Sequence, residues 1–276
     1  MRREQVSIGR KTISFLASGG AGAEARTRRD RHVLFLHAFP LQAAMWEPTL
    51  DALPKGWHGI APDFRGMGES SLPAGEAEHR MTDFAGDAVD LLDRLEIPDA
   101  VVVGCSMGGY VLFEMLRAAP GMLMALGLVS TRPGSDSEEG RRNRERMIAQ
   151  VEQEGLDAIA NQMVPKLIGA TTQRERPEIA KRVRDLIVAN ARQGVSTAVS
   201  AMMHRADSTS LLKRIAVPTL IVAGAEDALI PPAEADAMHK EIPTSRCELI
   251  PFVGHLPNLE EPTHFNAILS EFLDTL

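Results

Sequence analysis

The sequence has few cysteines, only Cys105 and Cys247 among its 276 residues. Two cysteines do not make a disulfide framework, so the sequence excludes a small domain held together mainly by disulfide bonds. Cys105 follows an apolar β-branched run, and we interpret it as a small packing residue rather than as a nucleophile.

The chain also lacks a long apolar run and an excess of positive charge. No segment reaches the roughly 18 consecutive apolar residues of a membrane span, and the apolar stretch Ile13 to Ala17 is too short for the core of a signal peptide. The formal net charge of −7 argues against a nucleic-acid partner. We therefore expect a cytoplasmic protein that uses neither a membrane nor a nucleic acid as partner, and its oligomeric state stays open.

Clusters of basic residues do occur, at Arg26 to Arg31 and at Arg141 to Arg146. Both are interspersed with acids or flanked by polar residues, so we interpret them as a solvated loop and a solvated helix face rather than as anion sites. The sequence has no cluster of His and Cys at ligand spacing, and we expect no metal and no organic cofactor.

Strand and helix patterns alternate along most of the chain. A β-hairpin is predicted at Gln5 to Ile8 and Lys11 to Leu16, followed by a polar loop from Gly19 to Asp30. Further strands are predicted at Val33–Leu36, Trp57–Ala61, Ala100–Gly104, Leu123–Val129, Ile215–Val222 and Cys247–Ile250, and helices at Met45–Leu53, Met81–Leu95 (with Thr82 as N-cap), Tyr110–Ala119, Ala233–Lys240 and Thr263–Leu273. This alternation predicts an α/β fold with a mostly parallel, doubly wound sheet.

The alternation stops between Pro133 and Asp207. This segment contains helix formers, such as Arg141 to Glu154 and Ile179 to Arg192, separated by Gly155, Gly169, Pro177 and Gly194, and no convincing strand. We predict a cap of about four helices at residues 133–207, inserted into a core made of residues 1–132 and 208–276.

A nucleophile is indicated by Gly104-Cys105-Ser106-Met107-Gly108-Gly109, which lies between a predicted strand and a predicted helix. Glycines at both ends of this Gly-x-Ser-x-Gly pattern leave room where side chains would collide with neighbouring backbone. The turn would expose Ser106 at the positive end of the following helix.

A serine needs a base and an orienting acid to act as a nucleophile. The base we predict is His255, in the Gly/Pro-rich loop after the last predicted strand. The acid we predict is Asp227, just after the strand that ends near Val222, with its neighbour Glu226 as the alternative. All three residues follow predicted strands, and the carboxyl ends of the strands are where α/β sheets place their ligands.

Acyl transfer at a serine also needs two donors for the developing oxyanion. We expect the backbone N–H groups of Met107 and Phe39 to supply them, the latter in His37-Ala38-Phe39-Pro40. His37 itself reads as a structural loop residue, although a place in the substrate pocket stays open.

Taken together, these motifs resemble the α/β-hydrolases, in particular the cofactor-free esterase, enol-lactonase and perhydrolase group. The resemblance rests on the segments His37–Pro40, Ala61–Ser70, Gly104–Gly109, Ala223–Pro231 and Gly254-His255, with Ala38 standing where the family usually has glycine. It implies a mostly parallel, eight-stranded-type sheet flanked by helices, and the chain order Ser, Asp, His is the one that this fold uses.

The resemblance implies a serine hydrolase that cleaves a small ester or lactone through an acyl-enzyme. An aspartate nucleophile, as in dehalogenases and epoxide hydrolases of this fold, is excluded by Ser106. Perhydrolase or carbon–carbon bond hydrolase chemistry, or a non-catalytic ligand receptor, are the alternatives. Pocket candidates are Arg132, which would pair with a substrate carboxylate, Leu256 beside the histidine, and the methionines Met122, Met124, Met163, Met202 and Met203, which would otherwise be ordinary core residues.

Overall fold

The computed structural model describes residues 1–18, 31–73 and 79–276. The predicted loop Gly19 to Asp30, and with it most of the basic cluster at residues 26–31, lies outside the described residues. Within the described residues, no helix is long and apolar enough to cross a membrane.

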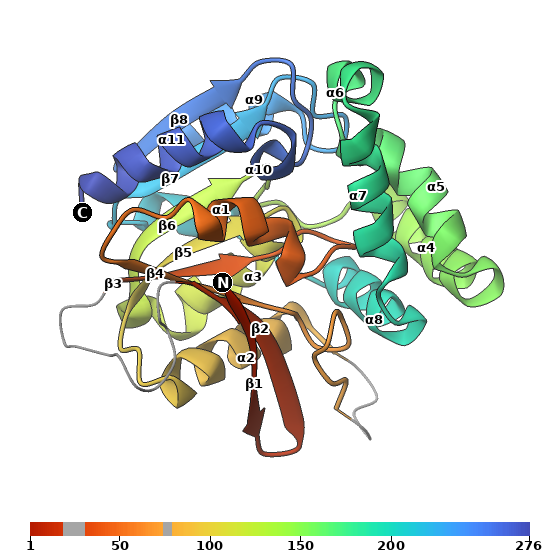
Figure 1. The fold of residues 1–276 in the computed structure, drawn as a ribbon, viewed down its shortest axis with the longest axis horizontal. Coiled ribbons are helices and arrows are strands. Elements are labelled where there is room, and N and C mark those ends of the chain that lie inside the picture. Colours follow the sequence, from red (N-terminus) through yellow and green to blue (C-terminus); the bar gives the residue numbers. More distant parts are fainter. Residues whose placement is uncertain (19–30, 74–78) are drawn as a thin grey trace.

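A single sheet of eight strands forms the centre of the described part of the molecule, in the order β1-β2-β4-β3-β5-β6-β7-β8 (Figure 1). The antiparallel hairpin β1–β2 pairs antiparallel with β4, and every other neighbouring pair is parallel. The strands are β1 (Arg2–Ile8), β2 (Lys11–Ala17), β3 (Arg31–Leu36), β4 (Trp57–Pro62), β5 (Ala100–Cys105), β6 (Leu123–Val129), β7 (Thr219–Gly224) and β8 (Ser245–Ile250).

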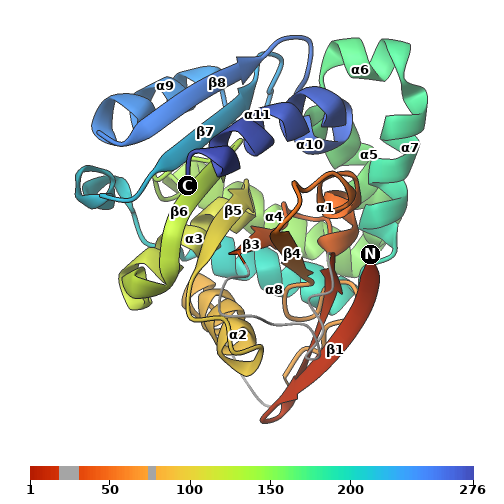
Figure 2. The same cartoon turned by 60° about the vertical axis from the view of Figure 1, so that its left-hand side comes forward.

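Helices cover both faces of this sheet (Figure 2). One face is covered by α2 (Met81–Arg94), α3 (Met107–Ala118) and α9 (Pro232–Glu241), and the other by α1 (Glu47–Asp51), α10 (Pro257–Glu260) and α11 (Pro262–Asp274). Short 3₁₀ turns complete the connections: η1 (Ala43–Trp46), η2 (Pro120–Met122) and η3 (Thr209–Arg214). The predicted mostly parallel sheet flanked by helices is therefore confirmed.

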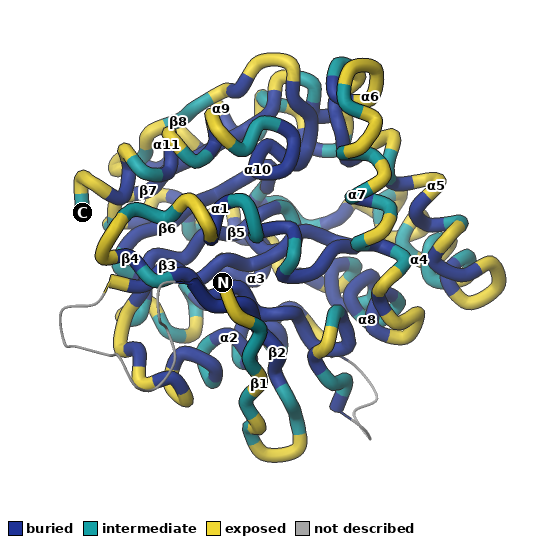
Figure 3. Tube along the Cα trace, in the orientation of Figure 1, coloured by how far each residue is buried: buried dark blue, intermediate teal, exposed yellow. Residues whose placement is uncertain are grey.

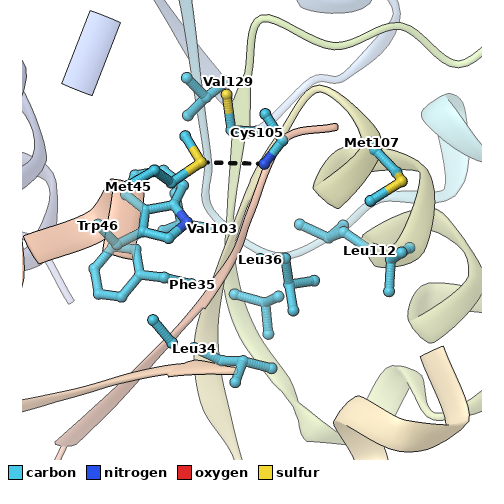
Figure 4. Packing of buried hydrophobic residues seen from close by; sticks show 14 of the residues in the cluster. Leu34, Phe35, Leu36, Met45, Trp46, Val103, Cys105, Met107, Leu112 and Val129 are labelled. Atoms are coloured by element: carbon cyan, nitrogen blue, oxygen red, sulfur yellow. Dashed lines mark hydrogen bonds between the residues drawn. The ribbon is translucent and has the colours of Figure 1, made fainter. Parts of the chain in front are cut away.

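The central parallel strands are buried on both faces, as their continuous apolar runs predict. Figure 3 shows the buried trace running through these strands, with exposed segments concentrated at turns and outer helices. In Figure 4, Phe35 and Trp46 pack together with ring centroids 5.0 Å apart, beside Val103 and Met45. This packing holds β3 and β5 in place. Both strands end at the edge of the sheet where the candidate site lies.

Between β6 and β7, all within the described residues, the chain forms five α-helices where about four were predicted. They are α4 (Glu138–Glu154), α5 (Leu156–Leu167), α6 (Ala170–Glu175), α7 (Pro177–Val188) and α8 (Arg192–Met203), and they gather on one side of the molecule (Figure 1). Gly155, Gly169 and Pro177 stand at breaks between helices, whereas Gly194 lies inside α8, where its Cα faces the backbone of Gly66 without room for a side chain.

Some predicted boundaries were wrong for local reasons. The N-cap of α2 is Arg80, not Thr82, and the Asp83 carboxylate accepts a hydrogen bond from the Arg80 N–H at 2.7 Å. Strand β7 begins at Thr219 instead of Ile215, because Pro218 has no N–H to donate to a sheet ladder.

Candidate active site

Ser106 stands on a sharp turn between β5 and α3. Its backbone has φ +53° and ψ −111°, a conformation that is strained for any residue with a side chain and that clusters at functional sites. A side chain on Gly104 would collide with the Gly108 carbonyl, and one on Gly108 would collide with the Leu36 carbonyl. The two glycines therefore permit the close approach of β3, β5 and α3 that this turn requires, as the sequence pattern predicts.

The turn is held from β6. The Ser106 N–H donates to the Val129 carbonyl at 2.8 Å, and the Thr131 hydroxyl donates to the Ser106 carbonyl at 2.8 Å. Helix α3 begins directly at Met107, three residues before the predicted start, because Gly108 and Gly109 are part of its first turn.

His255 and Asp227 form a buried pair, as expected. His255 Nδ1 lies 2.7 Å from Asp227 Oδ2, and both side chains are almost completely shielded from solvent. Asp227 Oδ1 accepts hydrogen bonds from the N–H groups of Leu229 and Ile230, each at 2.9 Å. Both oxygens of the Asp227 carboxylate thus have hydrogen-bond partners. Because Nδ1 of His255 faces Asp227, the ring nitrogen Nε2 is the one that can take a proton from a neighbouring group.

Ser106 and His255 line the same cavity, which has a volume of about 610 Å³. Segments that are far apart in the sequence, after β5, β7 and β8, therefore meet at one edge of the sheet. The arrangement places a strained serine and a carboxylate-oriented imidazole beside one cavity that a small molecule can enter.

Glu226, the alternative acid, points to a different partner. Its carboxylate accepts hydrogen bonds from the backbone N–H of Thr171 at 2.8 Å and from the Thr171 hydroxyl at 2.6 Å. These bonds lower the pKa of the Glu226 carboxyl. The structure therefore separates the two neighbours: Asp227 contacts His255, and Glu226 contacts α6.

The loop after β3 brings Phe39 to the cavity, while the Met107 side chain is buried at the start of α3. Met45 Sδ accepts a hydrogen bond from the Ala38 N–H at 3.2 Å, drawn as the dashed line in Figure 4, and the Leu41 N–H donates to the Ala38 carbonyl at 2.9 Å. Neither the Phe39 nor the Met107 N–H donates a backbone hydrogen bond among the described residues. Both N–H groups remain available to an oxyanion.

His37 is completely buried and does not line the cavity. Its Nδ1 lies 3.0 Å from the Ala38 carbonyl, and its Nε2 accepts a hydrogen bond from the Phe64 N–H at 3.0 Å. These partners require the tautomer protonated at Nδ1. Burial lowers the pKa of His37 to about 4, so the ring is neutral at physiological pH and holds the loop in place.

The low pKa of His37 predicts a loss of stability in mild acid. In the unfolded chain, histidine takes up its proton near pH 6.5, and in the folded chain only near pH 4. The unfolded state therefore binds more protons in this window, and stability that is fully present above pH 6.5 falls by about 3 kcal/mol as the pH drops to 4. Denaturant unfolding at several pH values gives the free energy of unfolding as a function of pH. The slope of this free energy against pH should be smaller for His37→Asn than for the wild type. His264→Asn, at an exposed site on α11, is the control, and an equal slope for His37→Asn and wild type contradicts the prediction.

Other predicted pocket residues divide into two groups. Arg132, Met163 and Met202 line the cavity with Ser106 and His255. Met203 and Leu256 do not, so these two predictions were wrong: Met203 is turned by about 100° from Met202 on α8, and Leu256 is fully buried. Met122 ends η2 and Met124 lies at the start of β6, at the opposite end of the sheet from Ser106.

Part of the cavity wall was not predicted from the sequence. Arg144 and Arg146, interpreted as part of a solvated helix face, line the cavity, and Arg144 Nε pairs with Asp136 Oδ2 at 2.9 Å. Only Arg141 and Arg142 of this cluster match that interpretation, since both are exposed and outside the cavity lining. The signal available in the sequence was the helical spacing of Asn143, Met147 and Gln150, which share the cavity side of α4.

Glu260 is a second omission. It is fully buried, and its carboxylate accepts hydrogen bonds from the N–H groups of Gly254 and Leu256, the two neighbours of His255. It also accepts from the Gly169 N–H at 2.8 Å and the Thr172 hydroxyl at 2.7 Å. This carboxylate fixes the backbone on both sides of His255 and ties it to the start of α6.

Asn190, after α7, makes a comparable connection to the loop that carries Phe39. Its Nδ2 donates to the Pro40 carbonyl at 2.8 Å, and its Oδ1 accepts from the Gly68 N–H at 2.8 Å. The helices between β6 and β7 are therefore hydrogen-bonded to the loops on two sides of the cavity.

Several known proteins are similar to this chain in sequence or in structure. A family model described as alpha/beta hydrolase fold matches residues 31–262. A thermophilic esterase from Thermogutta terrifontis, solved with malate bound, superposes with a TM-score of 0.91 at 34% identity over 100% of this chain and 99% of that one. The 3-oxoadipate enol-lactonase 2 of Acinetobacter baylyi is 26% identical over 87% of this chain and 89% of its own length. A bromoperoxidase from Bacillus anthracis, at 24% identity and TM-score 0.83 over 99% and 100% of the two chains, shares the fold.

Proposed function

Because the chain belongs to the α/β-hydrolase family, we propose that it is a carboxylic ester hydrolase in which Ser106, His255 and Asp227 form the catalytic triad. The observation that carries this proposal is the strained Ser106 beside a cavity that it shares with His255, whose Nδ1 is bonded to the buried Asp227 at 2.7 Å. Strained backbone conformations of this kind cluster at active sites, where the strain is part of the mechanism.

In this mechanism, His255 Nε2 takes the Ser106 proton as Oγ attacks the carbonyl carbon of an ester or lactone. Asp227 orients the ring and stabilises its charged form. The N–H groups of Phe39 and Met107 bind the oxyanion of the tetrahedral intermediate, which collapses as His255 protonates the leaving alcohol. Water then attacks the acyl-enzyme with His255 as base, and the acid product leaves Ser106 free.

We also propose that residues 133–207 act as a cap over a core of residues 1–132 and 208–276. The support is that α4, α5 and α8 contribute Met147, Met163 and Met202 to the cavity. Glu260, Glu226 and Asn190 connect these helices to the loops that carry the triad and Phe39. The core would supply the chemistry, and the cap would select the substrate.

A substrate panel tests the proposed activity. Short nitrophenyl esters and small lactones should both be hydrolysed by the purified protein with no added cofactor. Binding of these compounds without turnover would instead indicate a ligand receptor, and acyl transfer to peroxide faster than to water would indicate a perhydrolase.

Substitutions in the cap should change substrate preference. Met163→Ala and Met202→Ala enlarge the cavity, so the ratio of kcat/KM for nitrophenyl octanoate over nitrophenyl acetate should rise by about 10- to 100-fold per site, the range for a small change in an apolar pocket. Met203→Ala is the matched control, because its side chain does not line the cavity. An equal shift in the control would show that the effect does not come from the cavity wall.

A further inference from the structure

The cavity beside Ser106 has the opposite charge to the chain as a whole. The formal net charge of the chain is −7. Within the described residues, one carboxylate, Asp136, lines the cavity, against the four cationic side chains Arg132, Arg144, Arg146 and Lys166. A surplus of positive charge in a concave site raises the local concentration of anions.

The one carboxylate is already fully engaged. Asp136 is buried and lies 2.9 Å from Arg144 Nε and 2.8 Å from Arg205 Nη1, and Arg205 also stacks on Tyr110 at 4.2 Å from the ring centroid. Burial alone would raise the pKa of Asp136, but the charges of Arg144 and Arg205 outweigh burial and lower it. Asp136 is therefore already paired with two arginines, whose combined charge exceeds its own.

Arg132 is left with unused hydrogen-bonding capacity. Its guanidinium contacts Asp136 through a long hydrogen bond of 3.3 Å from Nη2, and its Nε is shielded from solvent without an acceptor among the described residues. A buried N–H of a charged group without an acceptor costs free energy. The planar fork of a guanidinium matches the two oxygens of a carboxylate, which would supply the missing acceptors.

Arg132 also lies in a suitable position to contact a molecule bound beside Ser106. It directly follows Thr131, whose hydroxyl donates to the Ser106 carbonyl, and it lines the cavity together with Ser106. Apolar side chains cover much of the remaining wall, namely Phe39, Met147, Met163, Met202, Leu229 and Ile230. A molecule bound here meets the nucleophile, an apolar surface and a cation in one cavity.

We propose that the cavity selects esters or lactones that carry a second, free carboxylate, and that Arg132 binds this carboxylate while the scissile carbonyl reaches Ser106. The inference rests on the proposed function, since it names the substrate class of the same site. Arg146 and Lys166, which are exposed, attract the anion towards the cavity, and Arg132 holds it.

Two matched substrate pairs test this inference, one for each side of the ester. Monoethyl glutarate and ethyl pentanoate differ by a carboxylate in place of a methyl group on the acyl chain, and 3-acetoxypropanoate and propyl acetate differ likewise on the alcohol side. Hydrolysis is followed by pH-stat titration. The wild type should show at least about tenfold higher kcat/KM for the charged member of one pair, the low end for a hydrogen-bonded charge.

Substitutions test whether Arg132 causes this preference for the charged substrate. Arg132→Gln should lower the charged-over-neutral ratio of kcat/KM for that pair by about 10- to 100-fold, and Arg132→Glu should lower it further. Arg142→Gln removes an exposed arginine of α4 outside the cavity lining and should keep the wild-type ratio. The inference is wrong if neither pair shows a preference for charge, or if Arg132→Gln and Arg142→Gln give the same ratio.

The neutral esters separate this inference from the proposed function. Ser106-dependent hydrolysis of ethyl pentanoate or propyl acetate without preference for charge would overturn the role of Arg132 alone. Absence of hydrolysis of all four compounds would overturn the proposed function as well.

Discussion

Ser106→Ala should lower kcat/KM for a short nitrophenyl ester by at least about a thousandfold, by analogy with removal of the nucleophile in serine proteases. The loss follows from the geometry, because Ser106 is the hydroxyl that the turn between β5 and α3 presents to the cavity shared with His255. Alanine adopts the same backbone as serine at no greater cost, so the melting temperature should stay near that of the wild type.

Ser130→Ala is a matched control for this prediction. Ser130 follows β6, is buried and also has a positive φ of 45°, but it does not line the cavity. Its substitution should keep activity within a few-fold of wild type. If Ser106→Ala keeps a tenth of the wild-type activity, Ser106 is not the nucleophile.

Asp227→Asn should lower turnover by up to about ten-thousandfold, as the corresponding change does in serine proteases. The Asp227 carboxylate accepts the Nδ1–H of His255, and an amide in its place favours the wrong tautomer and no longer stabilises the charged imidazole. Steady-state kinetics with a nitrophenyl ester measure the effect.

Glu226→Gln is the control for the acid, because it makes the same chemical change one residue earlier in the chain. Its carboxylate contacts Thr171 instead of His255, so its substitution should reduce turnover by less than about tenfold, the scale of one weakened hydrogen bond to a charged group. If Glu226→Gln were the more damaging of the two variants, the choice of Asp227 as the acid would be wrong.

Local patterns were sufficient to predict the framework of the site. The apolar run before Gly104 predicts a central strand, and the two glycines around Ser106 predict the tight turn, because both follow from sterics within a few residues. Asp227 and His255 were predictable as members of loops after strands, since parallel strands bring their carboxyl ends to one edge.

The residues that the sequence interpretation missed act through contacts between distant segments. Glu260 has the sequence context of a solvated acid, and only the folded chain brings the Gly169 N–H and the Thr172 hydroxyl to it. Arg144 reads as one of several arginines on a polar helix, and its difference from Arg142 is the buried Asp136 that it contacts. The helical spacing of Asn143, Met147 and Gln150 marks one face of α4, but the spacing alone does not show whether that face turns towards a cavity or towards solvent.

Covalent labelling tests the central claim most directly. The purified protein is treated with a small fluorophosphonate, and the adduct is located by mass spectrometry of the peptides. We expect one adduct per chain, on Ser106, with esterase activity lost in proportion to labelling, and no adduct in Ser106→Ala. Labelling of a different residue in step with the loss of activity, or full activity after Ser106 is completely labelled, would contradict it.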